Sequence, residues 1–289
     1  MIQEISPKKY HVEYRQDIAP DPSSGMMVCS SRGVLVKTGA EAERLPRFSD
    51  FTEAGLSFDV LAGKARYLFR VDDDHYFLVP QSIVPDQVLE NGFRFVPVGG
   101  FRSFASQEEA YVAVTASQFW RFYSTRRYCG RCGTENVHSR TERAMVCPHC
   151  GLTEYPKISP AIIVAVLDGD RILLTRYARN ASDYRRKALV AGFVEVGETP
   201  EDTVRREVFE ETGLHVKDIR PYKMQPWSFS DSLMLGFTAL LDGSPEIRID
   251  TAELCEAAWY TREEVPENPS MISVGNEMIQ AFRNGTLKR

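Results

Sequence analysis

Three glutamates recur at the spacing E-x-x-E-E, as Glu207, Glu210 and Glu211. In a helix, at 100° per residue, their side chains fall within an arc of about 100° on one face. Like charges at this spacing cost roughly 0.2–0.5 kcal/mol per pair, so we expect positive charge to compensate them. Arg206 can pair with Glu210, and oxygen-only ligands suit Mg²⁺ or Mn²⁺. For this spacing alone, a solvated acidic helix face is the alternative.

The residues around these glutamates predict the helix that positions them. Thr199 is a suitable N-cap, Pro200 suits the first helical position, and Gly213 favours a left-handed helix end. Upstream, Gly192 and Gly197 bracket the turn that enters the helix, where the backbone must curl tightly or approach a ligand closely. The sequence therefore predicts a glycine-bracketed turn followed by a helix with an acidic face.

Residues 192–214 read, without a gap, G, five residues, E, seven residues and R-E-V-F-E-E-T-G-L. This pattern resembles the signature of the Nudix hydrolases. The resemblance implies an α/β/α sandwich in which Glu207, Glu210 and Glu211 bind Mg²⁺ or Mn²⁺. It also implies displacement at phosphorus in a nucleoside diphosphate derivative. Glu198, in the turn before the helix, can reach the same cluster.

Four cysteines form a second group with metal-ligand spacing. They are paired as C-x₂-C with fourteen residues between the pairs, at Cys129, Cys132, Cys147 and Cys150. Two such knuckles around one ion provide tetrahedral S₄ coordination, which is typical of structural zinc. A redox C-x₂-C needs only one pair and leaves the other unexplained. Residues 121–143 carry six Arg and two Glu, so RNA contact is a further hypothesis for this ribbon.

A segment downstream of the helix bears on the substrate. Its sequence, Gln225-Pro-Trp227-Ser-Phe229-Ser-Asp-Ser232, resembles the array that marks the NADH pyrophosphatase subgroup, whose members also remove NAD caps from RNA. Three positions depart from that array, which are Met224, Ser228 and Ser230. Aromatic residues beside a diphosphate site suit a flat base or a nicotinamide ring, whereas packing of the segment on the sheet is the plainer alternative.

The same resemblance implies the remaining site residues. Phe193 and Tyr155 would stack on nicotinamide, with Tyr155 coming from the partner subunit of a homodimer, and Ile163 would line the same pocket. The other substrate-binding residues would be Gln225, Trp227, Phe229 and Ser232. Glu253 would be a further ligand of the Mg²⁺ or Mn²⁺. Each could instead be ordinary, with Tyr155 and Ile163 in a core and Glu253 on the surface.

The composition limits the cellular setting. The 289 residues are 43% apolar and carry a net charge of −5, which argues against a broadly basic nucleic-acid binder. No apolar run approaches the length of a membrane span, no signal pattern precedes Met26, and paired cysteines suit a reducing compartment. We therefore expect a cytoplasmic protein without membrane contact. Cys29 and Cys255 lie in apolar sequence surroundings and are expected to be inert core thiols.

The predicted fold class is α/β, in three domains. A β-rich, Nudix-like N-terminal domain is expected over residues 1–125, a Cys₄ zinc ribbon over 126–156 and the catalytic Nudix domain over 157–289. In the first, the patterns predict a strand at 33–38, a hairpin from 65–71 and 75–80, and a helix at 106–125. In the last, they predict strands at 161–167, 171–175, 187–190, 224–227, 233–241, 247–249 and 257–260, and helices ending at Gly213 and spanning 274–282.

The hypothesis that follows is metal-dependent hydrolysis of the pyrophosphate bond of NAD(H) to NMN(H) and AMP. NAD-capped RNA would yield NMN and 5′-monophosphate RNA. If the three departures reshape the pocket, ADP-ribose or another nucleoside diphosphate derivative is the alternative substrate. A zinc-ribbon RNA-binding protein with an idle Nudix fold is a further alternative, although an idle site has no need of such clustered charge.

Overall fold

A computed structural model describes residues 1–39, 42–90, 92–178 and 187–287 of the chain. Its backbone separates into two compact units, Ile2–Lys157 and Ile158–Arg289, with Met1 joining the second. Within the described residues, no helix is both long and apolar enough to cross a membrane.

The unit Ile2–Lys157 begins with short strands and short helices. The strands form one sheet in the order β1-β5-β6-β2 and another in the order β3-β4-β7. They are β1 (Tyr10–His11), β2 (Gly25–Met27), β3 (Cys29–Ser30), β4 (Gly33–Lys37), β5 (Arg66–Val71), β6 (Asp74–Leu78) and β7 (Phe93–Val96). The helices are α1 (Phe48–Glu53), α2 (Phe58–Ala62), α3 (Asp86–Leu89) and α4 (Gln107–Thr125), with short 3₁₀ turns η1 (Gln81–Ile83) and η2 (Val98–Ser103).

The elements predicted in this region are confirmed by β4, by the β5–β6 hairpin and by α4. Ser106 caps α4, because its side chain accepts a hydrogen bond of 3.2 Å from the backbone N–H of Glu109. The helices α1 to α3 were not predicted, so this region is mixed rather than dominated by strands. Its core contains aromatic side chains with no exposed surface, including Phe48 and Phe51 of α1.

The zinc-ribbon segment follows α4 in the same unit. It holds three two-residue strands, β8 (Val137–His138), β9 (Met145–Val146) and β10 (Thr153–Glu154), paired antiparallel in the order β10-β9-β8. Strands this short contribute little stability by themselves, so the ribbon depends on other interactions for its fold.

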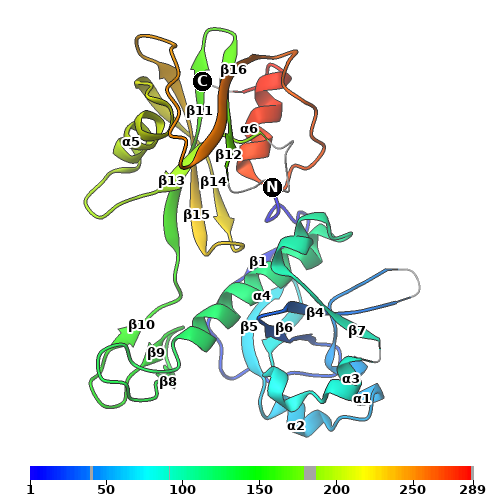
Figure 1. Ribbon diagram of the computed structural model, residues 1–289. Coiled ribbons are helices and arrows are strands. Elements are labelled where there is room, and N and C mark those ends of the chain that lie inside the picture. Colours follow the sequence, from blue (N-terminus) through cyan, green and yellow to red (C-terminus); the bar gives the residue numbers. More distant parts are fainter. Residues whose placement is uncertain (40–41, 91, 179–186, 288–289) are drawn as a thin grey trace. The chain divides into compact units, whose positions relative to one another are not determined.

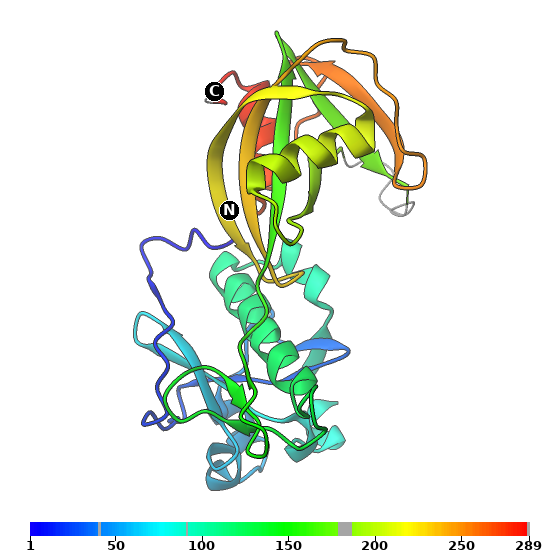
Figure 2. The same cartoon turned by 90° about the vertical axis from the view of Figure 1, so that its left-hand side faces the viewer.

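The unit Ile158–Arg289 is a sheet with one helix on each face (Figures 1 and 2). The strand order is β14-β15-β11-β12-β16, and β13 also pairs with β11. The strands are β11 (Ser159–Asp168), β12 (Arg171–Tyr177), β13 (Val190–Phe193), β14 (Val216–Trp227), β15 (Ser232–Leu241) and β16 (Leu254–Thr261). The helices are α5 (Pro200–Thr212) and α6 (Val274–Arg283). Only β11 and β15 pair in parallel; the other pairs between these described strands are antiparallel.

The central strand β11 explains why both faces of the sheet carry a helix. Side chains alternate between the faces of a strand, and β11 is apolar at successive positions. Ile162 and Val164 pack in the cluster that contains Val204 and Val208 of α5. Ala165 belongs to the cluster on the α6 face. An apolar strand of this kind is stable when both faces are covered, which yields the predicted α/β/α sandwich.

Three of the predicted strands need correction. The strand predicted at 187–190 is found at Val190–Phe193, because this segment pairs with β11, whereas Ala188 forms only an isolated bridge with Thr175. Residues 247–249 form no strand, because the backbone N–H of Arg248 donates to the carbonyl of Thr212 at the end of α5 rather than to a neighbouring strand. The strand predicted at 224–227 begins at Val216, and its pairing with β15 is interrupted by two register shifts. Such bulges protect an edge strand such as β14 from further pairing.

Candidate active site

The helix α5 carries the acidic face that its sequence predicted. Thr199 is the N-cap, and its side chain accepts a hydrogen bond of 3.2 Å from the backbone N–H of Asp202. Gly213 ends the helix at φ +71°, in the left-handed conformation. These local interactions fix the helix phase and therefore the direction of its three glutamates.

Arg206 supplies the positive charge that the glutamates require. Its guanidinium lies 2.6 Å from a carboxylate oxygen of Glu198, 2.8 Å from Glu207 and 3.0 Å from Glu210. It also donates a hydrogen bond of 3.0 Å to the carbonyl of Phe193. The predicted pairing of Arg206 with Glu210 is confirmed. Hydrogen bonds from Arg206, the largest influence, lower the pKa of Glu198 to about 2.

The close packing of β13 against α5 explains why residue 192 is a glycine. A Cβ atom at this position would lie 1.9 Å from Cδ of Glu207, so any side chain would collide with the carboxylate. The close approach, rather than an unusual backbone conformation, requires glycine here. Burial raises the pKa of Glu207, although Arg206 counteracts it.

Glu211 has the most unusual environment of the three. Its side chain is 2% exposed, and its Oε2 atom has no hydrogen-bond partner. Burial is the main cause that raises the pKa of Glu211 to about 8, with further contributions from the charges of Glu207 and Glu253. A buried carboxylate oxygen without a partner beside further carboxylates is a donor set that fits a divalent cation.

Glu253 lies in the exposed segment just before β16. Its backbone N–H donates to the carbonyl of Asp250 at 3.2 Å, and the N–H of Asp250 donates to the carbonyl of Glu211 at 3.0 Å. Backbone hydrogen bonds thus link this segment to the end of α5. Among the described residues, the cysteines are the only group of three or more candidate ligands that could hold a metal ion as they stand, so the carboxylates do not form a closed metal site by themselves.

Five of the seven substrate residues proposed from the sequence share one face of the sheet. Phe193 pairs with Ala161 in register, and Ala161 and Ile163 alternate with Ile162, so Phe193 and Ile163 lie on the α6 face. The parallel and antiparallel registers through Ser159 and Ser232 assign the same face to a further set of side chains, namely Gln225, Trp227 and Ser232. Gly192, one residue before Phe193, faces α5 instead.

The environments of these residues differ. Phe193 is 53% exposed, whereas Gln225 is fully buried. The amide of Gln225 donates to the carbonyl of Ile272 at 2.8 Å and accepts from the N–H of Val274 at 2.7 Å. Its side chain is therefore used to attach β14 to the start of α6, which leaves no surface for direct substrate contact in this arrangement.

Three further substrate candidates lie where β14 turns into β15. Trp227 ends β14, Phe229 lies in the connecting loop, and Ser232 begins β15. The rings of Trp227 and Phe229 lie 4.6 Å apart at 45°, so they pack against each other. Ser232 is 4% exposed, and its hydroxyl lies 3.1 Å from that of Ser230. Ser230, one of the three departures from the subgroup array, therefore places a second hydroxyl beside that of Ser232.

Ile163 and Tyr155 have different structural settings. A Cβ atom on Gly275 would lie 2.7 Å from Cδ1 of Ile163, so Ile163 packs closely under the first turn of α6. Tyr155 belongs to the unit Ile2–Lys157, where it is 58% exposed and its hydroxyl donates to Glu142 at 3.1 Å. Stacking of Tyr155 on nicotinamide and lining of the same pocket by Ile163 therefore stay predictions.

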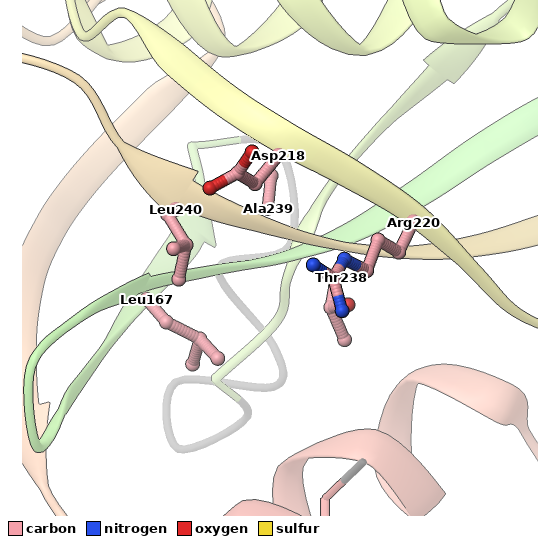
Figure 3. A pocket seen from close by; sticks show the side chains of 6 residues that line it. All are labelled: Leu167, Asp218, Arg220, Thr238, Ala239 and Leu240. Atoms are coloured by element: carbon pink, nitrogen blue, oxygen red, sulfur yellow. The ribbon is translucent and has the colours of Figure 1, made fainter. Parts of the chain in front are cut away.

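A hollow of about 230 Å³ occurs elsewhere on the same sheet (Figure 3). It is lined by Leu167, Asp218, Arg220, Thr238, Ala239 and Leu240. Leu167 and Leu240 pair near the far ends of β11 and β15, whereas Ser159 and Ser232 pair at their beginnings. The hollow is therefore separate from the predicted substrate residues.

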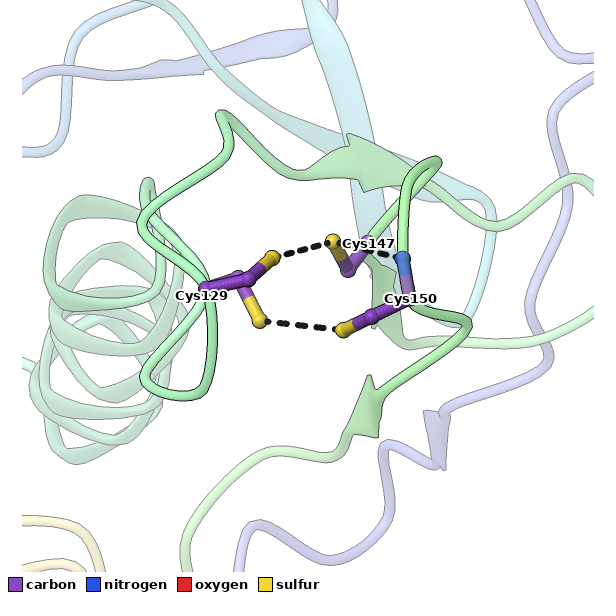
Figure 4. A group of neighbouring side chains, drawn as sticks. Cys129, Cys147 and Cys150 are labelled. Atoms are coloured by element: carbon purple, nitrogen blue, oxygen red, sulfur yellow. Dashed lines mark hydrogen bonds between the residues drawn. The ribbon is translucent and has the colours of Figure 1, made fainter.

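The four predicted zinc ligands converge in the ribbon (Figure 4). The sulfurs of Cys129 and Cys150 lie 3.6 Å apart, and those of Cys132 and Cys147 lie 3.4 Å apart. A tetrahedron of sulfurs about 2.3 Å from zinc has edges of about 3.8 Å, so both distances are close to those of a site for one zinc ion. His149 is not part of the group.

At least three of the six arginines of the ribbon make contacts within their own unit. Arg126 pairs with Glu154 at 2.9 Å, and Arg127 pairs with Glu135 at 3.0 Å. Arg143 donates to two backbone carbonyls and stacks on aromatic rings. These interactions leave less unpaired charge than the composition suggests, which weakens the hypothesis that the ribbon binds RNA.

Sequence reasoning missed one residue that touches the glutamates. The hydroxyl of Tyr177, at the end of β12, lies 3.5 Å from Oε1 of Glu211. A tyrosine at the end of a strand carries no motif signal, and only the folded sheet brings it to α5. The expectation for Cys255 was also wrong, because Cys255 is exposed, whereas Cys29 is buried and burial raises its pKa to about 12.

Comparison with known proteins assigns the class of this site. Residues 157–282 match the NUDIX domain model, and residues 124–155 match the model for the NADH pyrophosphatase zinc ribbon domain. The second half of the chain thus matches the Nudix domain, and the segment before it matches the zinc ribbon of the NADH pyrophosphatases.

Individual known proteins are similar to parts of this chain. Proteins named NAD-capped RNA hydrolase NudC from Escherichia coli O1:K1 / APEC and strain SMS-3-5 / SECEC are 46% identical over 163 residues. The match covers 56% of this chain and 62% of each relative, less than two thirds of their length. A solved NUDIX hydrolase from Nitrosomonas europaea has a TM-score of 0.46 at 22% identity, covering 55% of this chain and 93% of that chain.

Proposed function

We propose that the protein hydrolyses the central pyrophosphate bond of NAD(H), giving NMN(H) and AMP. It acts in the same way on NAD-capped RNA, giving NMN and RNA with a 5′-monophosphate. The similarity to proteins named NAD-capped RNA hydrolase NudC, together with the zinc ribbon of the NADH pyrophosphatases, supports this choice of substrate class.

One observation carries the proposal: two consecutive residues of β13 serve opposite faces of the sheet. Gly192 lies against the carboxylate of Glu207, whereas Phe193 presents an exposed ring on the α6 face. A dinucleotide that crosses the end of β13 can therefore hold its pyrophosphate at the carboxylates and its nicotinamide ring against Phe193. A substrate without the second ring would leave the Phe193 surface unused.

The chemistry requires divalent cations, for which Glu207, Glu210, Glu211 and Glu253 would be the protein ligands. Bound Mg²⁺ or Mn²⁺ would neutralise the charge that develops on the pyrophosphate and assist the attacking water. Glu211 contributes the buried, unpartnered Oε2 atom. Arg206 holds Glu198, Glu207 and Glu210 in place, which reduces the repulsion among them.

Tyr155 and the loop complete the proposed substrate site. Tyr155 is exposed on its own unit and would stack on the nicotinamide of the partner subunit in a homodimer. Trp227 and Phe229 would form an aromatic wall, with Ser232 behind them. Gln225 would act indirectly, by attaching this segment to α6. The reduced thiols of the ribbon suit a cytoplasmic location.

The direct test is product analysis with purified protein. NADH, NAD-capped RNA and ADP-ribose are incubated separately with Mg²⁺ or Mn²⁺, and the products are resolved by liquid chromatography and mass spectrometry. We expect NMNH with AMP from NADH, and NMN with 5′-monophosphate RNA from the capped RNA. Faster hydrolysis of ADP-ribose than of both would favour the alternative substrate. No hydrolysis with either metal would favour an idle fold.

Subunit mixing tests the proposed exchange of Tyr155. The Tyr155→Ala and Glu211→Gln variants each impair every site of their own homodimer. In a mixed dimer, one site combines the intact Tyr155 of one chain with the intact Glu211 of the other. Recovery of up to a quarter of wild-type activity after mixing, as random reassortment predicts, would support the exchange. Mixing without recovery would place Tyr155 in its own chain's site or outside any site.

A further inference from the structure

The side chain of Tyr177 enters the carboxylate cluster from a different strand. Tyr177 ends β12, and its strand alternation assigns it to the same face as Leu173, which packs in the α5 cluster. The pairing of β12 with β16 shifts register between Arg176 and Tyr177. The extra residue at this shift, Cys255, belongs to β16, so the alternation of β12 continues to Tyr177 and directs its side chain to the α5 face, where Glu211 lies.

The tyrosine hydroxyl has two acceptors within reach. It lies 3.5 Å from Oε1 of Glu211 and 3.5 Å from the backbone carbonyl of Ala191. A hydroxyl has one proton, so it can donate to only one of these acceptors at a time. A hydrogen bond to an ionised carboxylate is shorter and about twice as strong as one to a neutral carbonyl. Glu211 is therefore the preferred acceptor whenever its carboxylate is charged.

The two carboxylate oxygens of Glu211 therefore have different surroundings. Oε1 faces the hydroxyl of Tyr177, while Oε2 is buried and has no hydrogen-bond partner. A carboxylate with one oxygen restrained cannot rotate freely, so its second oxygen keeps one direction. We propose that Tyr177 is a positioning residue, which holds Oε1 of Glu211 so that Oε2 remains directed at the catalytic cation. This inference rests on the proposed metal-dependent function.

Tyr177→Phe tests this role because it removes the hydroxyl and keeps the ring. Mn²⁺ affinity is measured by electron paramagnetic resonance on the full chain, and the kcat and the metal concentration for half-maximal rate are measured with NADH. Loss of such outer hydrogen bonds weakens metal affinity by about 10- to 100-fold. We expect that range for Tyr177→Phe, with the midpoint of thermal unfolding in chelator unchanged.

Tyr260→Phe is the matched control. Tyr260 lies on the neighbouring strand β16, and its hydroxyl donates to the carboxylate of Glu256 at 2.8 Å. The control therefore also deletes a hydroxyl that donates to a carboxylate, but one that does not touch Glu211. Its Mn²⁺ affinity should equal that of the wild type. A similar loss in both variants would show a general effect on the sheet and overturn the assignment.

Glu211→Gln separates failure of this inference from failure of the proposed function. If the wild type and Tyr177→Phe bind Mn²⁺ equally and Glu211→Gln does not, Tyr177 has no positioning role, although the metal site stands. If Glu211→Gln binds Mn²⁺ as well as the wild type, both the metal assignment and the role of Tyr177 are overturned. Weaker binding in Tyr177→Phe at unchanged thermal stability, beside an unaffected Tyr260→Phe, supports the proposal.

Discussion

The two proposed cation sites of this protein are built in opposite ways. In the ribbon, each C-x₂-C segment forms the same local turn. The N–H of Gly133 donates to the carbonyl of Cys129 at 2.9 Å, and the N–H of Gly151 donates to the carbonyl of Cys147 at 3.0 Å. Both glycines have positive φ angles, +73° and +71°. Two copies of one local structure therefore bring four sulfurs together.

The carboxylate cluster has no such local unit. Its parts come from β13, from α5, from the segment before β16 and from the end of β12, and Arg206 holds several of its glutamates together. One carboxylate, that of Glu211, is buried without a full set of partners. The comparison indicates that the ribbon is organised for stability, whereas the carboxylate cluster keeps unfavourable groups available for binding and chemistry.

The largest expected effect tests the structural role of the ribbon. Replacing both Cys147 and Cys150 by Ser removes half of the sulfur ligands. Zinc contributes about 10–16 kcal/mol to the folding of zinc-finger peptides, so the variant should lose its zinc and the ribbon should unfold. Native mass spectrometry and thermal unfolding measure both effects, and Cys255→Ser should keep one zinc per chain. Catalysis that follows zinc content at constant stability would contradict a purely structural ribbon.

Substitution in the carboxylate cluster should affect turnover rather than folding. Glu210→Gln and Glu211→Gln each remove a charged ligand, and we expect kcat to fall by at least about 100-fold. Steady-state kinetics with NADH measures the change. Glu201→Gln, in the first turn of the same helix, should retain nearly full kcat. Normal turnover in both variants would contradict the assignment of these glutamates to the active site.

The opposite face of the sheet should discriminate between substrates. Loss of a stacked aromatic side chain costs about 1–3 kcal/mol per base, so Phe193→Ala should lower kcat/KM for NADH and NAD-capped RNA by about 5- to 150-fold. ADP-ribose lacks nicotinamide, and its hydrolysis should fall much less. Phe209, which is 51% exposed on α5, offers Phe209→Ala as a control. Equal losses on all three substrates would indicate distortion of β13 beside Gly192.

The smallest effect concerns the pH dependence of the metal-free protein. Burial raises the pKa of Glu211 from 4.5 to about 8 in the folded state. Folding therefore favours the protonated form, so this stabilising contribution is complete below about pH 4.5 and is lost as the pH rises through 8. With chelator at pH 7.5, Glu211→Gln should raise the unfolding temperature by a few degrees, on the order of 1–3 kcal/mol.

Thermal unfolding across this pH range measures the effect of Glu211. The wild type should lose stability from about pH 4.5 to 8 relative to Glu211→Gln. Parallel curves for the two proteins would mean that Glu211 is charged and satisfied at neutral pH. Excess Mg²⁺ should reduce the difference, because a bound cation favours the ionised carboxylate.

Much of the architecture could be predicted from local sequence. Thr199 and Gly213 indicated the ends of α5, and the cysteine spacing indicated the ligands that the structure brings together. The predicted strand at 247–249 was wrong because Ile247 packs on the core while the backbone N–H of Arg248 donates to the end of α5. Periodicity predicts burial in such a case, but it does not identify the hydrogen-bond partner.

The sequence by itself determined the ligand types, the helix with its acidic face and the two cysteine knuckles, because each depends on residues close together along the chain. Only the tertiary structure decided the burial of Glu211, the contact from Tyr177 and the use of Gln225 to attach β14 to α6. These properties depend on which distant strands and helices exclude water from a side chain. Desolvation and long-range contacts have no local sequence pattern, and for that reason they emerged only with the fold.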